Sequence, residues 1–332
     1  MKLELIAFTQ RGNALAEQLA KTLSGHGHQA FCTRDGLKAE AWAERAFSRS
    51  EGLIFVGATG IAVRSIAPHL RHKSSDPAVI VVDEGGQFVI PILSGHLGGA
   101  NDLAREIASL TGAVPVITTA TDVNGVFAVD QWARQQGLMV CNPERILPVS
   151  SRLLAGETVG FFSDWPIDGE LPHELYPVSR EEAQVVLDLH RPEGNALWLC
   201  PKGVRVGMGC RRGTPAAALR TLLEDVLTQE GISEKAVCAL CTIDLKKDEP
   251  GLQELARERN VPLLTYSAQE LAQVPGNFTP SPFVEQITGV DNVCERAALA
   301  SGGTLLRKKT AKAGVTVALA MEELHLTWKE HL

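Results

Sequence analysis

Short apolar runs alternate with amphipathic stretches along the first third of the chain. The continuous apolar runs predict strands at residues 2–8, 29–32, 52–57, 78–83, 88–93 and 113–117. Apolar residues spaced three and four apart predict helices at residues 13–23, 37–47, 61–70 and 102–110. Strands that alternate with helices are typical of a doubly wound, mostly parallel sheet with helices on both faces.

The pattern changes twice further along the chain. From about Val126 the sequence is rich in Pro and Gly and loses the strand–helix rhythm, which predicts a linker or a small irregular domain. Apolar runs at 195–200 and 204–209 predict a hairpin that leads into a last domain. The last domain is expected to hold strands at 236–243, 262–266 and 315–320, and helices at 214–227, 251–259 and 292–300, the first of them capped by Thr214.

These patterns predict an α/β fold class in three parts. The N-terminal part, residues 1–125, is expected to be a doubly wound, mostly parallel sheet. Residues 126–200 form a small irregular middle region, and residues 201–332 form a C-terminal α/β domain.

Composition narrows the class of protein. A net charge of −7 and a pI near 5.8 argue against nucleic acid or an anionic membrane surface as a partner. No apolar stretch is long enough to span a membrane, and the first residues have too short an apolar core for a signal peptide, so a cytoplasmic location is expected. Seven cysteines are then expected as reduced thiols. Cys238 and Cys241 form a CxxC, but their alternating apolar context favours a buried strand over a metal or redox site.

The segment from Val81 to Asp102 combines several chemical groups at predicted strand ends. Asp83 and Glu84 precede two glycines, and they suit either a general base or proton relay or a solvated turn. Ser94 and His96 follow the next strand, and His96 suits either a catalytic or ligand-contacting role or a structural one. Ligands of open α/β sheets bind outside the carboxyl ends of strands, so the segment predicts a site.

The start of the following helix adds candidate donors. Gly98 and Gly99 let the backbone approach a ligand, and Asn101 could cap the helix or donate to a carbonyl oxygen. Ser94 lacks the G-x-S-x-G context of a nucleophile elbow, so Ser94 and His96 do not predict a catalytic triad.

Two further glycine-containing turns suit anions. Gly57, Thr59 and Gly60 lie between a predicted strand and a helix, and they fit either an anion site or a tight turn. Residues 207–214 fit neither the dinucleotide nor the P-loop pattern. What remains is a helix start with Gly209, Arg211, Arg212 and Thr214, which suits carboxylates or plain capping.

These motifs together resemble a known family. ATGIAVR (58–64), DPA (76–78), VVDEGGQFVIPILSGHLGGANDLA from Val81 and ITTATD (117–122) resemble the cobalt-precorrin-5A hydrolase family of anaerobic cobalamin (vitamin B12) biosynthesis. VGMGCRRGT (206–214) and GVTVALA, ending at Ala320, resemble the C-terminal module of that family. The segment 305–309 is more basic than the family pattern, which leaves the role of Lys309 open.

The resemblance implies a reaction and a substrate. A hydrolase of this family opens the δ-lactone of a cobalt-bearing, ring-contracted tetrapyrrole and releases acetaldehyde to give cobalt-precorrin-5B. Cobalt belongs to the substrate, so neither a cofactor nor a protein-bound metal is expected. Neighbouring enzymes of the pathway are the partners that such an intermediate implies.

Residue roles follow as hypotheses. His96 or Asp83, with Glu84, is the candidate base, and Gly98, Gly99 and Asn101 are candidate oxyanion donors. The groups expected to hold peripheral carboxylates are Gly57, Thr59, Gly60, Arg64, Arg211 and Arg212. Two other classes stay open, a non-catalytic tetrapyrrole carrier and a nucleotide-dependent oxidoreductase.

Overall fold

The computed structural model describes residues 1–33, 36–72 and 75–329 of the chain. The chain divides into two compact units, residues 1–134 with 150–157 and residues 135–149 with 158–332. The three-part division predicted from the sequence stays a prediction. No helix in the described ranges is long and apolar enough to cross a membrane.

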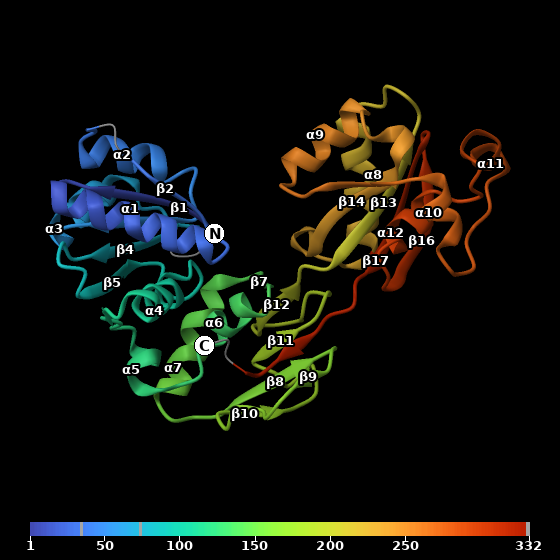
Figure 1. Ribbon diagram of the computed structural model, residues 1–332. Coiled ribbons are helices and arrows are strands. Elements are labelled where there is room, and N and C mark those ends of the chain that lie inside the picture. Colours follow the sequence, from blue (N-terminus) through green and yellow to red (C-terminus); the bar gives the residue numbers. More distant parts are fainter. Residues whose placement is uncertain (34–35, 73–74, 330–332) are drawn as a thin grey trace. The chain divides into compact units, whose positions relative to one another are not determined.

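The N-terminal unit is built on a six-stranded sheet of order β2-β1-β3-β4-β5-β6 (Figure 1). Its strands are β1 (Lys2–Ala7), β2 (Gln29–Cys32), β3 (Gly52–Val56), β4 (Ala78–Val82), β5 (Phe88–Leu93) and β6 (Val114–Pro115). Its helices are α1 (Gln10–Gly25), α2 (Ala39–Ala46), α3 (Thr59–Ile66), the 3₁₀ turn η1 (Ala67–His69), α4 (Ala100–Thr111), α5 (Ala120–Asn124) and α6 (Val129–Gln135).

Alternating strand residues bury the two faces of this sheet under different helices. Leu5 and Ile54 pack with α1 and α4 residues such as Leu19 and Leu103. On the other face, buried residues of the same strands pack with Trp42 of α2 and with α3. Helices on both faces confirm the doubly wound architecture.

Strand β5 departs from the expected parallel order. Strands β1 to β4 run parallel, whereas β5 pairs antiparallel with β4, in a register that places Val79 opposite Leu93. Only the short turn at residues 83–87 joins β4 to β5, and a parallel crossover needs a dozen residues or more. The carboxyl end of β5 therefore lies at the opposite edge of the sheet from the carboxyl ends of β1, β3 and β4.

The middle of the chain is more regular than the sequence suggested. It forms a five-stranded sheet of order β10-β8-β11-β12-β7. The elements here are β7 (Leu138–Val140), η2 (Pro143–Arg145), α7 (Ile146–Leu154), β8 (Val159–Ser163), β9 (Ile167–Asp168), β10 (Leu175–Pro177), β11 (Val185–Leu187) and β12 (Leu197–Pro201). Strand β9 pairs instead with β18 (Leu326–Thr327) from the end of the chain. Strands that pair here are often not consecutive in sequence, so this region lacks the regular alternation of strand and helix that predicted the other sheets.

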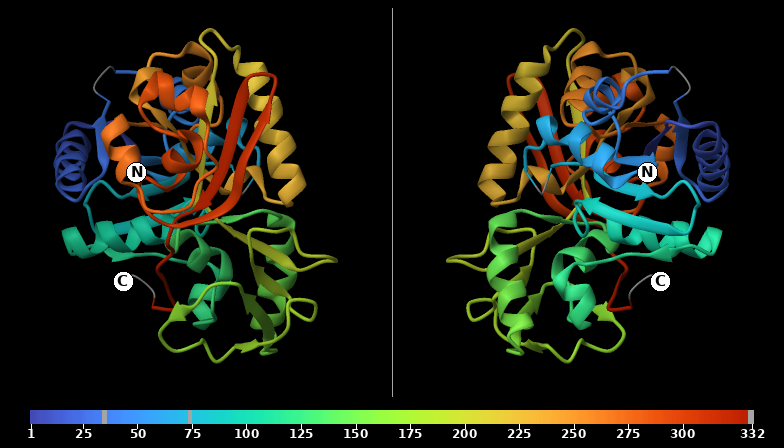
Figure 2. Two further views of the ribbon diagram at one scale, coloured as in Figure 1. Left: turned by 90° about the vertical axis from the view of Figure 1, so that its right-hand side faces the viewer. Right: turned by 90° about the vertical axis from the view of Figure 1, so that its left-hand side faces the viewer.

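The third sheet has the order β15-β14-β13-β17-β16. It comprises β13 (Val204–Cys210), α8 (Ala216–Glu230), η3 (Glu234–Ala236), β14 (Val237–Ile243), η4 (Asp244–Lys246), α9 (Pro250–Glu258), β15 (Leu263–Tyr266), α10 (Ala268–Gln273), α11 (Pro282–Thr288), α12 (Cys294–Leu299), β16 (Thr304–Lys312) and β17 (Val315–Met321). Figure 2 shows the β16–β17 hairpin, in red, running beside α8.

Two local predictions for this region are wrong. The runs at 195–200 and 204–209 do not form a hairpin, because β12 pairs with β11 and β7 whereas β13 pairs with β14 and β17. Helix α8 begins at Ala216 with Pro215 at its N-cap, and the hydroxyl of Thr214 donates instead to the carbonyl of Arg211 at 2.7 Å.

Candidate functional site

The segment between β5 and α4 is a tightly packed turn. Ser94 has a φ of +57°, and its hydroxyl donates to the carbonyl of Asp76 at 2.9 Å. A Cβ on Gly98 would lie 2.4 Å from the Cβ of Ser94, and a Cβ on Gly95 would lie 2.8 Å from Oδ1 of Asn101. These glycines are therefore required by packing, independently of any ligand.

The side chain of His96 lies between two aspartates. Its Nε2 is 2.9 Å from Oδ2 of Asp122, and its Nδ1 is 3.1 Å from Oδ1 of Asp130. The His96 side chain is 12% exposed, and the two carboxylates are 8% and 9% exposed. An ionised carboxylate only accepts hydrogen bonds, so both contacts are made when both ring nitrogens carry a proton. The geometry fits an imidazolium.

The electrostatics favour the same state. Burial alone would lower the pKa of His96, but the hydrogen bonds and negative charges of Asp122 and Asp130 outweigh burial and raise the pKa to about 9. Burial would raise the pKa of Asp122, but His96 and Arg105 hold it below its usual value. His96 is therefore charged at neutral pH, and an imidazolium has no lone pair with which to act as a base.

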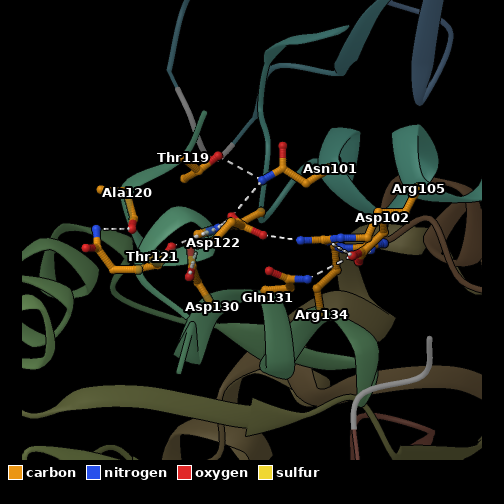
Figure 3. A network of polar contacts seen from close by, with 12 residues as sticks. Asn101, Asp102, Arg105, Thr119, Ala120, Thr121, Asp122, Asp130, Gln131 and Arg134 are labelled. Carbon is orange, nitrogen blue, oxygen red and sulfur yellow. Dashed lines mark hydrogen bonds and ion pairs between the residues drawn. The ribbon is translucent and has the colours of Figure 1, made fainter. Parts of the chain in front are cut away.

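The contact with Asp122 extends into a larger polar network (Figure 3). The side-chain amide of Asn101 donates to Oδ2 of Asp122 at 3.0 Å and to Oγ1 of Thr119 at 2.8 Å, and Arg105 donates to Oδ1 of Asp122. Asp102 in turn accepts hydrogen bonds from Arg105, Arg134 and Gln131, with distances of 3.1 Å from Arg105 and 2.8 Å from Gln131. The carboxylates of this network are Asp102, Asp122 and Asp130, and its cations are His96, Arg105 and Arg134.

Two of the predicted oxyanion donors are already engaged. The N–H of Gly99 donates to the carbonyl of His96 at 2.9 Å, and the N–H of Asn101 donates to the carbonyl of Gly95 at 3.0 Å. Gly99 has a φ of +82°, and a Cβ there would lie 2.8 Å from the guanidinium of Arg134. Either N–H could reach an oxyanion only if its present hydrogen bond broke.

Asp83 and Glu84 lie at the other end of β5 from His96. Both oxygens of Asp83 accept backbone N–H groups, from Gly85 at 2.9 Å, Gln87 at 2.7 Å and Phe88 at 2.6 Å. Six residues of β5 at about 3.4 Å each separate this turn from the His96 segment, a distance of about 20 Å. The sequence offered His96 or Asp83, with Glu84, as the base, and the structure places these two alternatives at opposite ends of β5.

The edge that holds Asp83 also holds the first glycine turn. The N–H of Gly57 donates to the carbonyl of Val82 at 2.8 Å, and Thr59 begins α3. A Cβ on Gly60 would meet no atom within 4 Å, and Arg64 is exposed. Thr9, which the sequence did not single out, caps α1 by accepting the N–H of Gly12 at 3.0 Å and also donates to Glu84. This edge is therefore open to solvent.

The remaining predicted residues lie in the C-terminal unit. Gly209 lies in β13, where a Cβ would meet Oγ1 of Thr316 at 2.6 Å. Arg211 and Arg212 are exposed, and Thr214 ends the same loop. The sequence grouped these residues with those of the N-terminal unit as one set of substrate contacts, and each unit carries its own part of that set.

The open question about Lys309 has a structural answer. Its N–H donates to Oε1 of the fully buried Glu295 at 2.7 Å, and its ammonium donates to the carbonyl of Thr279 at 3.3 Å.

Cys238 and Cys241 lie three residues apart on β14 and so point to opposite faces of the sheet. Burial raises the pKa of both thiols, that of Cys241 to about 12.

A cavity in the C-terminal unit is lined by none of the predicted site residues. It has a volume of about 370 Å³ and is lined by residues of the C-terminal unit, including Arg220, Lys235 and Arg259. Arg220 pairs with Glu258, and Arg259 pairs with Glu224 and Glu234. The positive charges of the two arginines that line this cavity are therefore already neutralised by protein carboxylates.

Sequence reasoning missed the partners of His96. Asp122 stood only within the ITTATD motif, Asp130 was not predicted as a site residue, and neither was Arg105, which binds Asp122. A signal existed for Arg105, which follows Asn101 by one helical turn and so shares its face of α4. No comparable spacing connects Asp122 or Asp130 to His96.

Comparison with known proteins gives the class of the chain. Three family models match consecutive stretches: "Cobalamin synthesis G N-terminal" at residues 41–122, "Cobalamin biosynthesis central region" at 127–201 and "Cobalamin synthesis G C-terminus" at 204–320. These matches define a protein of cobalamin synthesis.

Relatives that match over most of the chain define the family. The cobalt-precorrin-5A hydrolase of Salmonella typhimurium is 40% identical, covering 96% of this chain and 97% of the relative. The enzyme of the same name from Priestia megaterium is 38% identical, covering 82% of this chain and 79% of the relative. A crystal structure of a cobalamin biosynthesis protein G homologue from Sulfolobus solfataricus is 21% identical and covers 97% of both chains with a TM-score of 0.44. The chain belongs to the cobalamin synthesis G family.

Proposed function

We propose that this chain is a cobalt-precorrin-5A hydrolase. The observation that supports this activity most directly is 40% identity, over nearly the full length of both chains, to a relative that bears that name. In the reaction, water adds to the lactone carbonyl and the acyl C–O bond breaks, which leaves a carboxylate and a hydroxyl group on the two-carbon fragment. That hydroxyl then loses its proton and becomes the carbonyl of acetaldehyde as the C–C bond to the macrocycle breaks, and the electron pair of this bond takes up a proton on the macrocycle.

Within this reaction we assign His96 the role of a proton donor. Both of its ring nitrogens face a carboxylate oxygen, and its pKa of about 9 keeps both nitrogens protonated at neutral pH. The oxygen released when the lactone opens needs such a proton. The substrate oxygen would replace Asp130 as the acceptor at Nδ1, because that contact is the longer of the two, while Asp122 continues to hold Nε2. This assignment replaces the base role that the sequence suggested for His96.

The other site residues are assigned to substrate binding. Gly57, Thr59, Gly60 and Arg64 on the N-terminal unit, and Arg211 and Arg212 on the C-terminal unit, suit the acetate and propionate groups of a tetrapyrrole. The cobalt is part of the substrate, so the proposal requires no resident metal or cofactor. We expect the enzyme to work in the cytoplasm and to pass its product to the next enzyme of the pathway.

Release of acetaldehyde is the decisive measurement. Purified protein mixed with cobalt-precorrin-5A should yield one acetaldehyde per substrate, detected by coupled reduction, together with a mass shift of the corrinoid. A carrier would bind the substrate without producing acetaldehyde. An oxidoreductase would instead show saturable NAD(P) binding in a titration. Either of these results would overturn the proposal.

A further inference from the structure

The loop between β13 and α8 presents two arginines to solvent. Arg211 and Arg212 are both exposed, and neither guanidinium forms an ion pair with a carboxylate in residues 1–33, 36–72 and 75–329. Arg211 lies along the β16–β17 turn, where a Cβ on Gly314 would come within 3.0 Å of its Nε. The charge of Arg212 helps to hold the pKa of the nearby Glu249 low, but neither guanidinium forms an ion pair with that carboxylate, so both are suited to bind a carboxylate from a ligand.

A buried carboxylate holds this loop in place. Glu249 is 6% exposed, and its Oε1 accepts the N–H of Gly213 at 2.5 Å. Its Oε2 accepts the ammonium of Lys246 at 3.0 Å. Gly213 has a φ of +76°, a conformation that side chains other than glycine rarely adopt. The charge-assisted hydrogen bond from the N–H of Gly213 to Glu249 therefore fixes Gly213, which directly follows the arginine pair.

Close packing of α9 against the loop restricts it further. A Cβ on Gly251 would lie 2.2 Å from the carbonyl oxygen of Thr214, so the first turn of α9 abuts the loop. Burial would raise the pKa of Glu249, but its bonds to Lys246 and Gly213 hold the pKa below its usual value. The carboxylate thus stays ionised at neutral pH and keeps both partners.

We propose that Glu249 is a positioning residue that holds Arg211 and Arg212 in a geometry for binding peripheral carboxylates of the substrate. This inference rests on the substrate class of the proposed function. It goes beyond that function because Glu249 itself does not touch the substrate. It acts through the backbone of Gly213.

Two substitutions and one matched control test the idea. Glu249→Ala removes both acceptors, whereas Glu249→Gln keeps an oxygen for the N–H of Gly213 and loses the charge that attracts Lys246. Glu295→Gln is the control, because Glu295 is also a buried carboxylate of this unit that accepts backbone N–H groups, from Thr279 at 3.0 Å and Lys309 at 2.7 Å. It anchors a different segment.

Binding is measured with uroporphyrin III, a porphyrin with eight carboxylates, by fluorescence titration at low and high salt. We expect Glu249→Ala to weaken binding about tenfold, which corresponds to about 1.4 kcal/mol, Glu249→Gln to weaken it less, and Glu295→Gln to leave it unchanged. The double variant Arg211→Ala/Arg212→Ala should weaken binding at least as much as Glu249→Ala and flatten the salt dependence. In turnover, Glu249→Ala should raise KM and leave kcat within about twofold.

Several results would overturn the inference. Unchanged affinity in Glu249→Ala alongside weak binding in the double arginine variant would show that the loop holds its shape without Glu249. Equal losses in Glu249→Ala and Glu295→Gln would point to general destabilisation. If Glu249→Ala does not fold, Glu249→Gln carries the test, and affinity equal to wild type then ends the idea. If the wild-type protein releases no acetaldehyde, the hydrolase proposal fails. The role of Glu249 is then still decided by the uroporphyrin III titrations, which do not depend on turnover.

Discussion

The two ends of strand β5 differ in almost every physical respect, although they belong to one sheet. At its carboxyl end, His96 lies between two buried carboxylates in a network of three cations and three carboxylates, and the glycines are required by close packing. At its amino end, Glu84 and Gly60 lie on an exposed edge where α1 and α3 begin. Phe8 is 38% exposed there and packs beside Gly57.

This difference separates a site for proton chemistry from a surface for binding. A buried imidazolium between carboxylates is held in one orientation and carries a proton that it can donate. At the exposed edge, Gly60 has open space beside it and Arg64 is exposed, so a ligand can approach both residues without displacing a neighbour. We therefore expect substitutions at the His96 end to affect kcat and stability, and substitutions at the exposed edge to affect KM.

The largest expected effect is on turnover. His96→Ala should lower kcat for acetaldehyde release by about 10² or more, because a general acid or base usually contributes about 10² to 10⁴ in rate. Glu84→Gln should change kcat less than about tenfold, because Glu84 lies on the opposite edge of the sheet. Steady-state kinetics with cobalt-precorrin-5A measures both.

Circular dichroism and urea unfolding control for loss of the fold in His96→Ala. The reverse pattern, in which Glu84→Gln abolishes turnover and folded His96→Ala retains it, would move the chemistry to the exposed edge. The His96 network would then be a purely structural ion cluster.

The second expected effect is a dependence of stability on alkaline pH. The folded-state pKa of His96 is raised from 6.5 to about 9, so its stabilising contribution is complete below pH 6.5 and is lost as the pH rises toward 9. The shift corresponds to a contribution on the order of 3 kcal/mol. Urea midpoints should therefore fall between pH 6.5 and 9.

His96→Gln isolates this contribution from other groups that titrate in the same range. The difference in unfolding free energy between wild type and His96→Gln should shrink by about 3 kcal/mol from pH 6 to pH 9. A difference that stays constant across this range would mean that His96 is neutral in the folded protein, and the proton-donor assignment would fail with it.

The sequence predicted the outer architecture better than the site. Periodicity placed α1 and α4 and the strands of the first sheet within a few residues, because each buries an apolar face that local spacing records. The sequence placed Asp83 and His96 at the same edge of the sheet, but β5 runs antiparallel to β4 and carries His96 to the opposite edge. Asp83 lies thirteen residues before His96 in sequence but at the other end of the strand. Asp122 and Asp130, 26 and 34 residues away from His96, contact it directly.

Spacing in sequence could not reveal those contacts, because they depend on where the fold places α5 and α6 beside the turn that follows β5. The β12–β13 prediction failed for the same reason. The turn at Pro201–Gly203 has the composition of a hairpin, yet the two strands find other partners. Pairing between strands is set by the whole sheet, and a local turn signal does not contain that information.

A smaller effect is expected from adding one methyl group at the packed end. Gly98→Ala places a Cβ 2.4 Å from the Cβ of Ser94 and 2.8 Å from its carbonyl oxygen, so the turn must shift. Overpacking of this kind costs about 1–3 kcal/mol. Urea unfolding should show this loss, and kcat should fall because the turn also carries His96. Unchanged stability would show that the segment is looser than its geometry implies.

A glycine to alanine substitution at the exposed edge should change stability in the opposite direction. Gly60 is the second residue of α3, and a Cβ there meets no atom within 4 Å. Gly60→Ala should therefore raise stability by about 0.5–1 kcal/mol, because alanine loses less backbone entropy in a helix. If this edge binds the substrate, the added methyl group occupies space that the ligand needs, and KM should rise while the melting temperature also rises. A variant that is more stable and has an unchanged KM would remove Gly60 from the binding surface, because a methyl group that a ligand does not meet cannot alter its affinity.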